Sequence, residues 1–372
     1  ALKPEAIVEA DISTLNALTH LLLSDHQIDR ATAILLDEET GPLAVLKANP
    51  DLASASIAMD SYRMAIQLIG RQVAEGKLAN AAANDRIRSY IVSLQGVANA
   101  ATDGQTILAS IFVSLARDLE HMLQETTSAA SRQRLASLFT IVAGEAAKAD
   151  AFNTQYWAAD TLLSVGDELR RDPETRPQAG PAYAEAANVL ARIADRSKSE
   201  PYWIEDSAMQ TQVKLLLARS RKGAGDYAGS VAVLGEVLRE TPMLLDVQIE
   251  AARTLQAWGS TKPIFFKTAY EGGPRDRKTG QNLFWGWGKI AQMTVGKEDY
   301  SEQFFDARYQ LAYTRFKYGA SLTDATQKES VLRRAEKDIQ QTSALYPELG
   351  GPASKAKFEA LLKEIRKAIG NG

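Results

Sequence analysis

Residues 211–244 read TQVKLLLARSRKGAGDYAGSVAVLGEVLRETPML, and this stretch decides the expected fold. Apolar residues recur there at three- and four-residue spacing, which is the period of an α-helix rather than the alternation of a strand. Gly225 supplies the left-handed backbone that ends a first helix, and Ala218 allows a second helix to approach the first closely. The stretch therefore predicts two helices joined by a tight turn.

The same pattern of a small residue followed seven positions later by Gly recurs along the chain. The intervals between successive glycines of the pattern are 59, 34 and 60 residues. The middle interval is the period of a helix-turn-helix repeat, and the other two equal that period with about 25 residues inserted. The four pairs are Ala159/Gly166, Ala218/Gly225, Ala252/Gly259 and Ala312/Gly319.

Residues 211–244 resemble one tetratricopeptide repeat throughout. The matching positions are Leu217-Ala218, Gly225-Asp226-Tyr227, Ser230, Val237-Leu238 and Pro242. The resemblance implies that Ala218 and Ser230 pack the two helices together and that Pro242 ends the second helix. It extends over residues 151–352, and it implies antiparallel helix pairs stacked in a right-handed superhelix, an α-solenoid.

The neighbouring repeats depart from this pattern. Gly166-Asp167 repeats the turn, and it predicts a second helix over residues 182–194. The third repeat has a first helix over Leu245–Gly259, then an insertion through Gly280, then a second helix near residues 282–294. The array is therefore expected to be divergent.

The last repeat is marked by Leu311-Ala312, Gly319, Ala335 and Pro347, with about 11 extra residues expected between its helices. Residues 353–372 follow as a C-terminal cap. We expect a helix over Ser354–Ile369 with lysines on its solvent-exposed face.

Residues 1–150 read as a helical extension of the same superhelix without a clean repeat signature. They hold four of the chain's 27 aromatic residues and carry 12 basic and 18 acidic side chains, against 31 and 28 in the remainder. These shifts predict a domain boundary near Asp150. The expected helices are Glu5–Leu23, Ser54–Glu75, Asn84–Asn99, Thr106–Gln124 and Ser131–Lys148.

Composition excludes several kinds of chemistry. The 372 residues include no Cys and three His, so the chain has no thiolate nucleophile, disulfide or Cys-based metal site, and we expect no metal, no cofactor and no catalytic residues. A net charge of −3 without a long basic cluster gives no basis for nucleic-acid binding.

The segment Gly272–Gly280 contains Lys278-Thr279, as a phosphate-binding loop would, but it lacks the Gly that precedes the Lys of such a loop. No apolar run is long enough to span a membrane.

The tetratricopeptide resemblance places the first helix of each pair along a concave groove. Carried over residue by residue, it implies a mixed cationic and aromatic surface for a protein or an acidic peptide, in which Arg219 and Arg253 lie one repeat apart on the same face. The Lys and Asn set of chaperone-binding members is not reproduced. The implied groove residues are Asn153, Tyr156, Asp160, Arg219, Lys222, Arg253, Asp306, Tyr309, Tyr313 and Lys317.

A second cluster is rich in aromatic residues, and two interpretations of it stay open. It forms either the local core that closes the insertion of the third repeat or an exposed binding patch, for which Trp and Tyr are well suited. The cluster consists of Phe265, Phe266, Tyr270, Phe284, Trp285 and Trp287.

These observations predict a non-enzymatic α-solenoid that binds another protein as a scaffold. The alternative is a self-assembling structural subunit of a filament or an extracellular layer, with copies joined head to tail through complementary charge. The sequence leaves export and a cytoplasmic location as equal alternatives.

Overall fold

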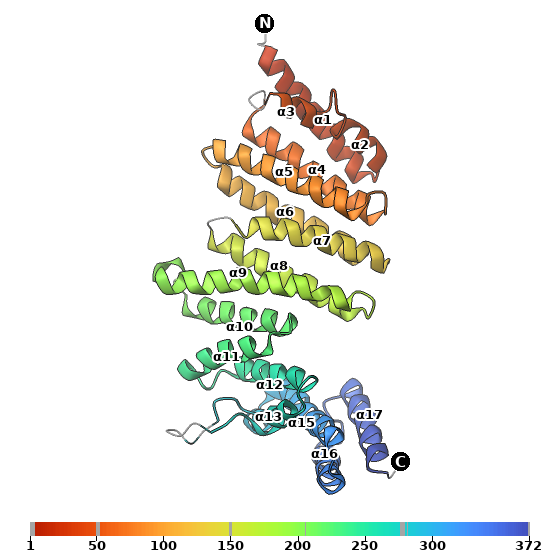
Figure 1. Cartoon of the computed structure of the whole chain (residues 1–372), viewed down its shortest axis with the longest axis vertical. Helices are drawn as coiled ribbons and strands as arrows, with labels where there is room; N and C mark the ends of the chain where they lie inside the picture. Colours follow the sequence, from red (N-terminus) through yellow and green to blue (C-terminus); the bar gives the residue numbers. More distant parts are fainter. Residues whose placement is uncertain are drawn as a thin grey trace. The chain divides into compact units, whose positions relative to one another are not determined.

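The computed structural model describes residues 4–49, 53–148, 151–204, 206–275, 280 and 282–370. These residues form 17 α-helices and a few short 3-10 turns, and their only extended pairing is an isolated antiparallel bridge between Arg275 and Asn282. Most consecutive helices pack against each other (Figure 1). The all-α class predicted from the sequence is therefore confirmed.

The chain divides into two compact units, Ala1–Ser207 (unit 1) and Ala208–Gly372 (unit 2). In unit 1 the pairs α4 and α5, α6 and α7, and α8 and α9 pack side by side. The five helices expected before residue 150 are all present, with ends within four residues of the predicted ones. The helices are α1 (Pro4–Ser24), α2 (Ile28–Leu35), α3 (Pro42–Ala48), α4 (Ala55–Ala74), α5 (Asn80–Ala100), α6 (Gly104–Glu125), α7 (Ala129–Ala146), α8 (Phe152–Arg171) and α9 (Ala179–Ser199).

Unit 2 continues the packing of consecutive helices. Its helix α17 packs on α15 and α16, as a capping helix does. Phe358, Leu361 and Ile365 of α17 are buried, and Lys363 and Lys367 face solvent. The helices are α10 (Ser207–Gly223), α11 (Tyr227–Glu240), α12 (Leu245–Gly259), α13 (Ile264–Glu271), α14 (Trp287–Thr294), α15 (Ser301–Ser321), α16 (Ala325–Leu345) and α17 (Pro352–Ile369). None of the helices built from described residues has the length and apolarity needed to cross a bilayer.

The small residues of the repeated pattern are buried, as close helix packing requires. Gly225 has a φ of +87° in the turn between α10 and α11, so its predicted role at a helix end is confirmed. The turn predicted at Gly166-Asp167 is wrong, because α8 continues to Arg171. The four buried alanines are Ala159, Ala218, Ala252 and Ala312.

The other three glycines of the pattern lack the positive φ of Gly225 and instead allow close contact. A Cβ atom at Gly166 would lie 2.8 Å from the ring of Tyr183, and one at Gly259 would lie 2.5 Å from the ring of Phe266. In both cases the ring belongs to the next helix. Gly319 contacts Leu332 of α16 in the same way, at 3.1 Å. The absence of a side chain therefore lets a bulky residue of the following helix approach the backbone.

The third repeat differs from its prediction. Helix α12 has the predicted bounds, but the segment expected as an insertion contains α13, which packs against α12. The helix expected near residues 282–294 begins only at Trp287 and packs mainly against α15. Thus α13 takes the place expected for the later helix.

The last repeat also differs from its prediction. The extra residues lie within its helices, because α15 and α16 each have 21 residues and only residues 322–324 separate them. The added length therefore extends the packed surface between the two helices instead of forming a long loop.

The compact units do not coincide with the domains expected from composition. Helices α7 and α8 flank Asp150 and pack against each other, so the change in aromatic content falls inside unit 1. Charge, in contrast, divides at the boundary between the units. Unit 1 carries 18 Lys and Arg against 28 Asp and Glu, a net charge of −10, and unit 2 carries 25 against 18, a net charge of +7.

The contact at Gly166 yields a stability prediction. We expect Gly166→Ala to lower the free energy of unfolding by about 1–3 kcal/mol, because the new methyl group overpacks against Tyr183. The matched control is Gly144→Ala on α7, where an added Cβ meets no atom within 4 Å and Ala should stabilise the helix by up to about 1 kcal/mol. Urea unfolding followed by circular dichroism measures both; equal effects would contradict the packing role of Gly166.

Candidate functional site

A cleft of about 800 Å³ lies within unit 2, between α12, α15 and the start of α17. Three of the predicted groove residues, Arg253, Asp306 and Tyr309, line it. Helices α12 and α15 supply most of its walls, and the first turns of α17 close one side. Its other lining residues are Ile249, Ser301, Glu302, Gln303, Phe305, Gln310, Gly350, Ala353, Ser354 and Lys357.

A polar chain connects the surface of this cleft to the interior. Arg253 Nη2 lies 3.1 Å from Asp306 Oδ2, and Gln310 donates to the other oxygen of Asp306 at 3.1 Å. Gln256 donates to Gln310 at 2.8 Å and accepts a hydrogen bond from the indole of Trp287 at 2.9 Å. The chain joins α12, α14 and α15, so it fixes the relative positions of two cleft walls.

Arg219 and Lys222 have a different role from the one predicted. Glu250 is buried on α12, and its carboxylate pairs with Lys222 Nζ at 2.6 Å and with Arg219 Nε at 3.4 Å. Both cations therefore neutralise a carboxylate of their own chain. Arg219 and Arg253 each pair with a carboxylate of this chain, Glu250 and Asp306 respectively, and their binding of a partner's carboxylate stays a prediction.

The sequence analysis missed Glu250. The sequence signal for Glu250 is its place on the buried face of α12. The residues spaced along that helical face are all buried, namely Val247, Glu250, Ala251 and Thr254. A carboxylate on an apolar face requires a cationic partner, which would have directed attention to the preceding helix.

The two tyrosines and the lysine that were expected on the groove pack partly against one another. Tyr309 and Tyr313 stack with their ring centroids 6.2 Å apart, and Tyr309 meets the ring of Phe358 edge to face at 5.4 Å. Lys317 Nζ lies 5.3 Å from the ring centroid of Tyr313. Burial raises the pKa of the Tyr309 hydroxyl.

The remaining predicted groove residues, Asn153, Tyr156 and Asp160, belong to α8 in unit 1. Asn153 and Asp160 are exposed, and Tyr156 packs on Phe152 with ring centroids 5.6 Å apart. The ten predicted residues are thus divided between the two units, and three of them line the cleft.

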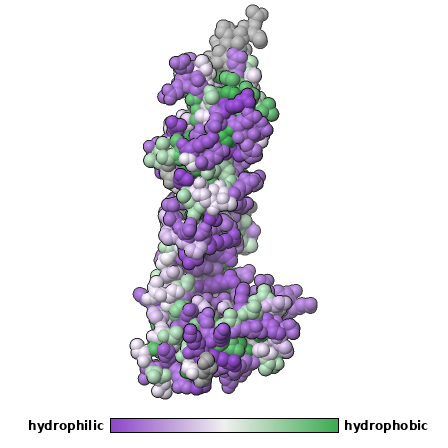
Figure 2. Space-filling view, turned by 90° about the vertical axis from the view of Figure 1, so that its right-hand side faces the viewer, coloured by the Kyte–Doolittle hydropathy of each residue, from purple (hydrophilic) through white to green (hydrophobic). Residues whose placement is uncertain are grey.

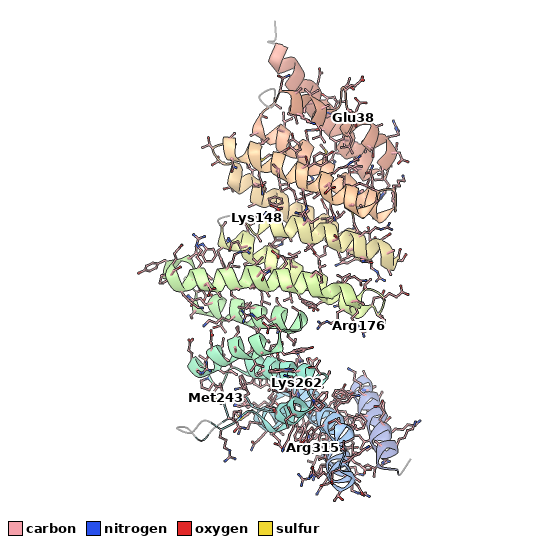
Figure 3. The ribbon with its side chains drawn as sticks, viewed as in Figure 1. Glu38, Lys148, Arg176, Met243, Lys262 and Arg315 are labelled. Carbon is pink, nitrogen blue, oxygen red and sulfur yellow. The ribbon has the colours of Figure 1, made fainter. Side chains whose placement is uncertain are left out.

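The aromatic cluster forms the core of unit 2, which is the first of its two interpretations. Trp287 is fully buried, Phe266, Tyr270 and Trp285 are buried, and Phe265 and Phe284 pack against the same core. Phe265 also stacks on Trp258 with ring centroids 3.7 Å apart. Lys262, labelled in Figure 3, lies 5.9 Å from the ring centroid of Trp258. Burial raises the pKa of Tyr270 to about 12.

A buried glutamine fixes the segment that carries these rings. Gln248 accepts a hydrogen bond from the backbone N–H of Trp285 at 2.7 Å, and its amide donates to the carbonyl oxygens of Pro242 and Leu283 at 2.9 and 3.0 Å. The oxygen and the nitrogen of this one amide therefore both make hydrogen bonds to loop backbone. Lys278-Thr279, which we compared with a phosphate-binding loop, lies outside the described residues.

The described side chains do not gather into a metal site of three or more His, Cys, Asp or Glu residues. His26 lies 3.4 Å from Arg71, and His121 lies 3.1 Å from Glu125.

The buried carboxylate gives a second stability prediction. Replacing both Arg219 and Lys222 with Met leaves Glu250 buried and unpaired, which we expect to cost about 3–5 kcal/mol of unfolding free energy. Adding Glu250→Leu to this variant should recover most of the loss, since no uncompensated charge then remains. The comparison variant Arg253→Ala breaks an exposed pair and should cost at most about 1 kcal/mol. Thermal or urea unfolding measures all three; no recovery in the triple variant would contradict the expectation.

Comparison with protein-family models finds no match, and comparison with curated proteins finds none either. Among solved structures, the chain is similar to one described as "Circular tandem repeat protein with novel repeat topology and enhanced subunit contact surfaces". The two are 14% identical with a TM-score of 0.34, and the match covers 98% of this chain and 96% of that chain.

Proposed function

We propose that the protein is a non-enzymatic scaffold and that the cleft between α12, α15 and α17 binds a segment of another protein. The observation that carries the proposal is the cleft itself, because about 800 Å³ lies open between helices that are joined by half-buried polar contacts. A rigid frame with an open polar cleft suits recognition of a chain segment.

The finer assignment to a divergent tetratricopeptide-like array belongs to this proposal. It is supported by the pair α10 and α11, where Gly225 makes the turn and Ser230 Oγ donates to the Ala218 carbonyl at 2.8 Å. That contact brings the helices together at the two small residues that the resemblance singles out.

The charges of the cleft suggest the chemistry of the bound segment. Arg253 and Lys357 are cationic, and Arg253 is paired only with the half-exposed Asp306 among the described carboxylates. A carboxylate of the partner competes with Asp306 for the guanidinium and reaches Lys357 on the opposite wall. We therefore propose an acidic peptide segment as the ligand.

Absence of catalysis is also part of the proposal. It is supported by the lack of Cys and by the pairing of the buried Glu250 with two cations, which leaves that carboxylate no role as a base.

The cleft can be tested with peptides selected on the wild-type chain from a phage-displayed random library. Arg253→Glu together with Lys357→Glu should weaken their binding by about tenfold or more, equivalent to about 1.4 kcal/mol, because both carboxylate-binding cations are reversed. The control is Lys363→Glu with Lys367→Glu, which changes net charge equally on the exposed side of α17. Equal loss in both variants, measured by fluorescence anisotropy, would remove the cleft from the proposal.

A second candidate function is a self-assembling structural subunit, and it is favoured by the charge division between the units. A net charge of −10 on unit 1 and +7 on unit 2 attracts the first unit of one copy to the second unit of another.

This candidate predicts an association that depends on concentration and salt. Sedimentation should show a mass that rises with protein concentration and falls when salt is raised from about 0.05 M to about 0.5 M, because the screening length shortens below about 10 Å. A single mass at every concentration and salt would count against self-assembly and leave the scaffold proposal standing.

A further inference from the structure

A second cleft, of about 620 Å³, lies within unit 2 between α14, α15 and α16, and it shares no lining residue with the first. Its rim holds two exposed apolar side chains, Leu345 at 74% exposure and Val295 at 43%. Exposed apolar side chains around an apolar hollow are typical of a surface that a partner covers. The lining also includes Gly288, Ala291, Gln292, Phe304, Arg308, Gln341, Thr342, Ala344 and Tyr346.

One cation lines this apolar cleft. Arg308 Nε donates to Thr342 Oγ1 at 2.8 Å, and its Nη2 donates to the carbonyl oxygen of Asp338 at 3.0 Å. Both acceptors are neutral, and the Asp338 carboxylate pairs with Arg315, labelled in Figure 3, instead. Burial lowers the pKa of Arg308, as expected for a charge in apolar surroundings. The cleft thus offers apolar walls and a cation that suits a carboxylate.

Unit 1 carries a surface with the opposite chemistry on α1. Leu18 and Leu21 are 41% and 66% exposed, and their three-residue spacing places them on one side of the helix. Asp11 is exposed on α1, two helical turns before Leu18 along the same side, and Asp25 is exposed in the turn that directly follows the helix. The other side of α1 packs against α2 and α4. Figure 2 shows hydrophobic side chains near the N-terminal end of unit 1.

We propose that α1 of one copy of the chain packs into the α14–α16 cleft of a second copy, joining copies head to tail. Leu18 and Leu21 fill the apolar cleft beside Leu345 and Val295, and an aspartate at an end of the leucine stripe meets Arg308. The net charges of the two units favour this pairing over contact between two first units or two second units. This inference rests on the self-assembly candidate and names its surfaces; it does not depend on the first cleft.

The absence of Cys makes the contact directly testable. Leu21→Cys and Leu345→Cys, prepared separately and mixed under oxidised glutathione, should form the mixed disulfide between the two variants. The control pairs Leu345→Cys with Val92→Cys on α5, a valine as exposed as Leu21 at 66% but outside the proposed contact. Mixed Leu21–Leu345 product in clear excess over the control supports the proposal. Equal yields, or a majority of disulfide between two Leu21→Cys chains, would overturn it.

Sedimentation of aspartate variants separates failure of this surface from failure of self-assembly. Leu21→Asp and Leu345→Asp should each weaken association by about tenfold or more, whereas Val92→Asp should leave it unchanged. Both leucines are exposed, so the variants should keep the helical circular dichroism spectrum of the wild type. Association that persists in both variants would overturn the contact while self-assembly stands. A wild-type chain that stays monomeric would overturn both, and peptide binding to the first cleft would be unaffected.

Discussion

Close approach between consecutive helices is the constraint on which the rest of this structure depends. A single amphipathic helix cannot bury its own apolar stripe, so each helix requires the next one along the chain. The missing side chains at Gly166 and Gly259 admit the rings of Tyr183 and Phe266 from the following helix. Because these contacts join neighbours in sequence, these helix pairs are local, and each of them has a small residue where the two helices meet.

Helix α12 connects much of unit 2, because its polar side chains contact four other parts of the unit. Glu250 pairs with two cations of α10, Arg253 pairs with α15, and Gln256 reaches Trp287 of α14. Gln248 holds the backbone of the segment that precedes α14. Buried polar groups of this kind stabilise only when they are satisfied, so they restrict the unit to one arrangement of its helices. The cleft between α12 and α15 is a consequence of that arrangement.

The sequence allowed the helices to be predicted well where local signals decide the structure. The bounds of α12 follow from its apolar spacing and its terminal Gly, and the turn at Gly225 follows from the need for a positive φ. In the sequence, a glycine that makes room for an aromatic ring looks the same as a glycine that ends a helix. The pattern therefore predicts a turn at Gly166, although α8 continues past it. Helix α13 was missed because its eight residues follow α12 after only four residues.

The candidate site was less predictable than the fold. A helix face carried over from one repeat to the next predicts Arg253, Asp306 and Tyr309, and these three residues line one cleft although they belong to the two repeats that differ from their predicted form. Arg219 lies on the corresponding face, but its role depends on Glu250 of the next helix, a contact between residues 31 apart in sequence. Spacing alone does not specify which cation a buried carboxylate selects.

The anchoring of the segment before α14 by Gln248 has a consequence for engineering. The buried amide of Gln248 makes hydrogen bonds to the backbone of Leu283 and Trp285, which precede α14. The same amide donates to the carbonyl oxygen of Pro242, which precedes α12. The cost of closing a longer loop grows only slowly with its length. A foreign epitope or a reporter tag inserted between α13 and α14 should therefore leave both helices in place, since Gln248 holds the backbone of Trp285 on α12 whatever the length of the connection.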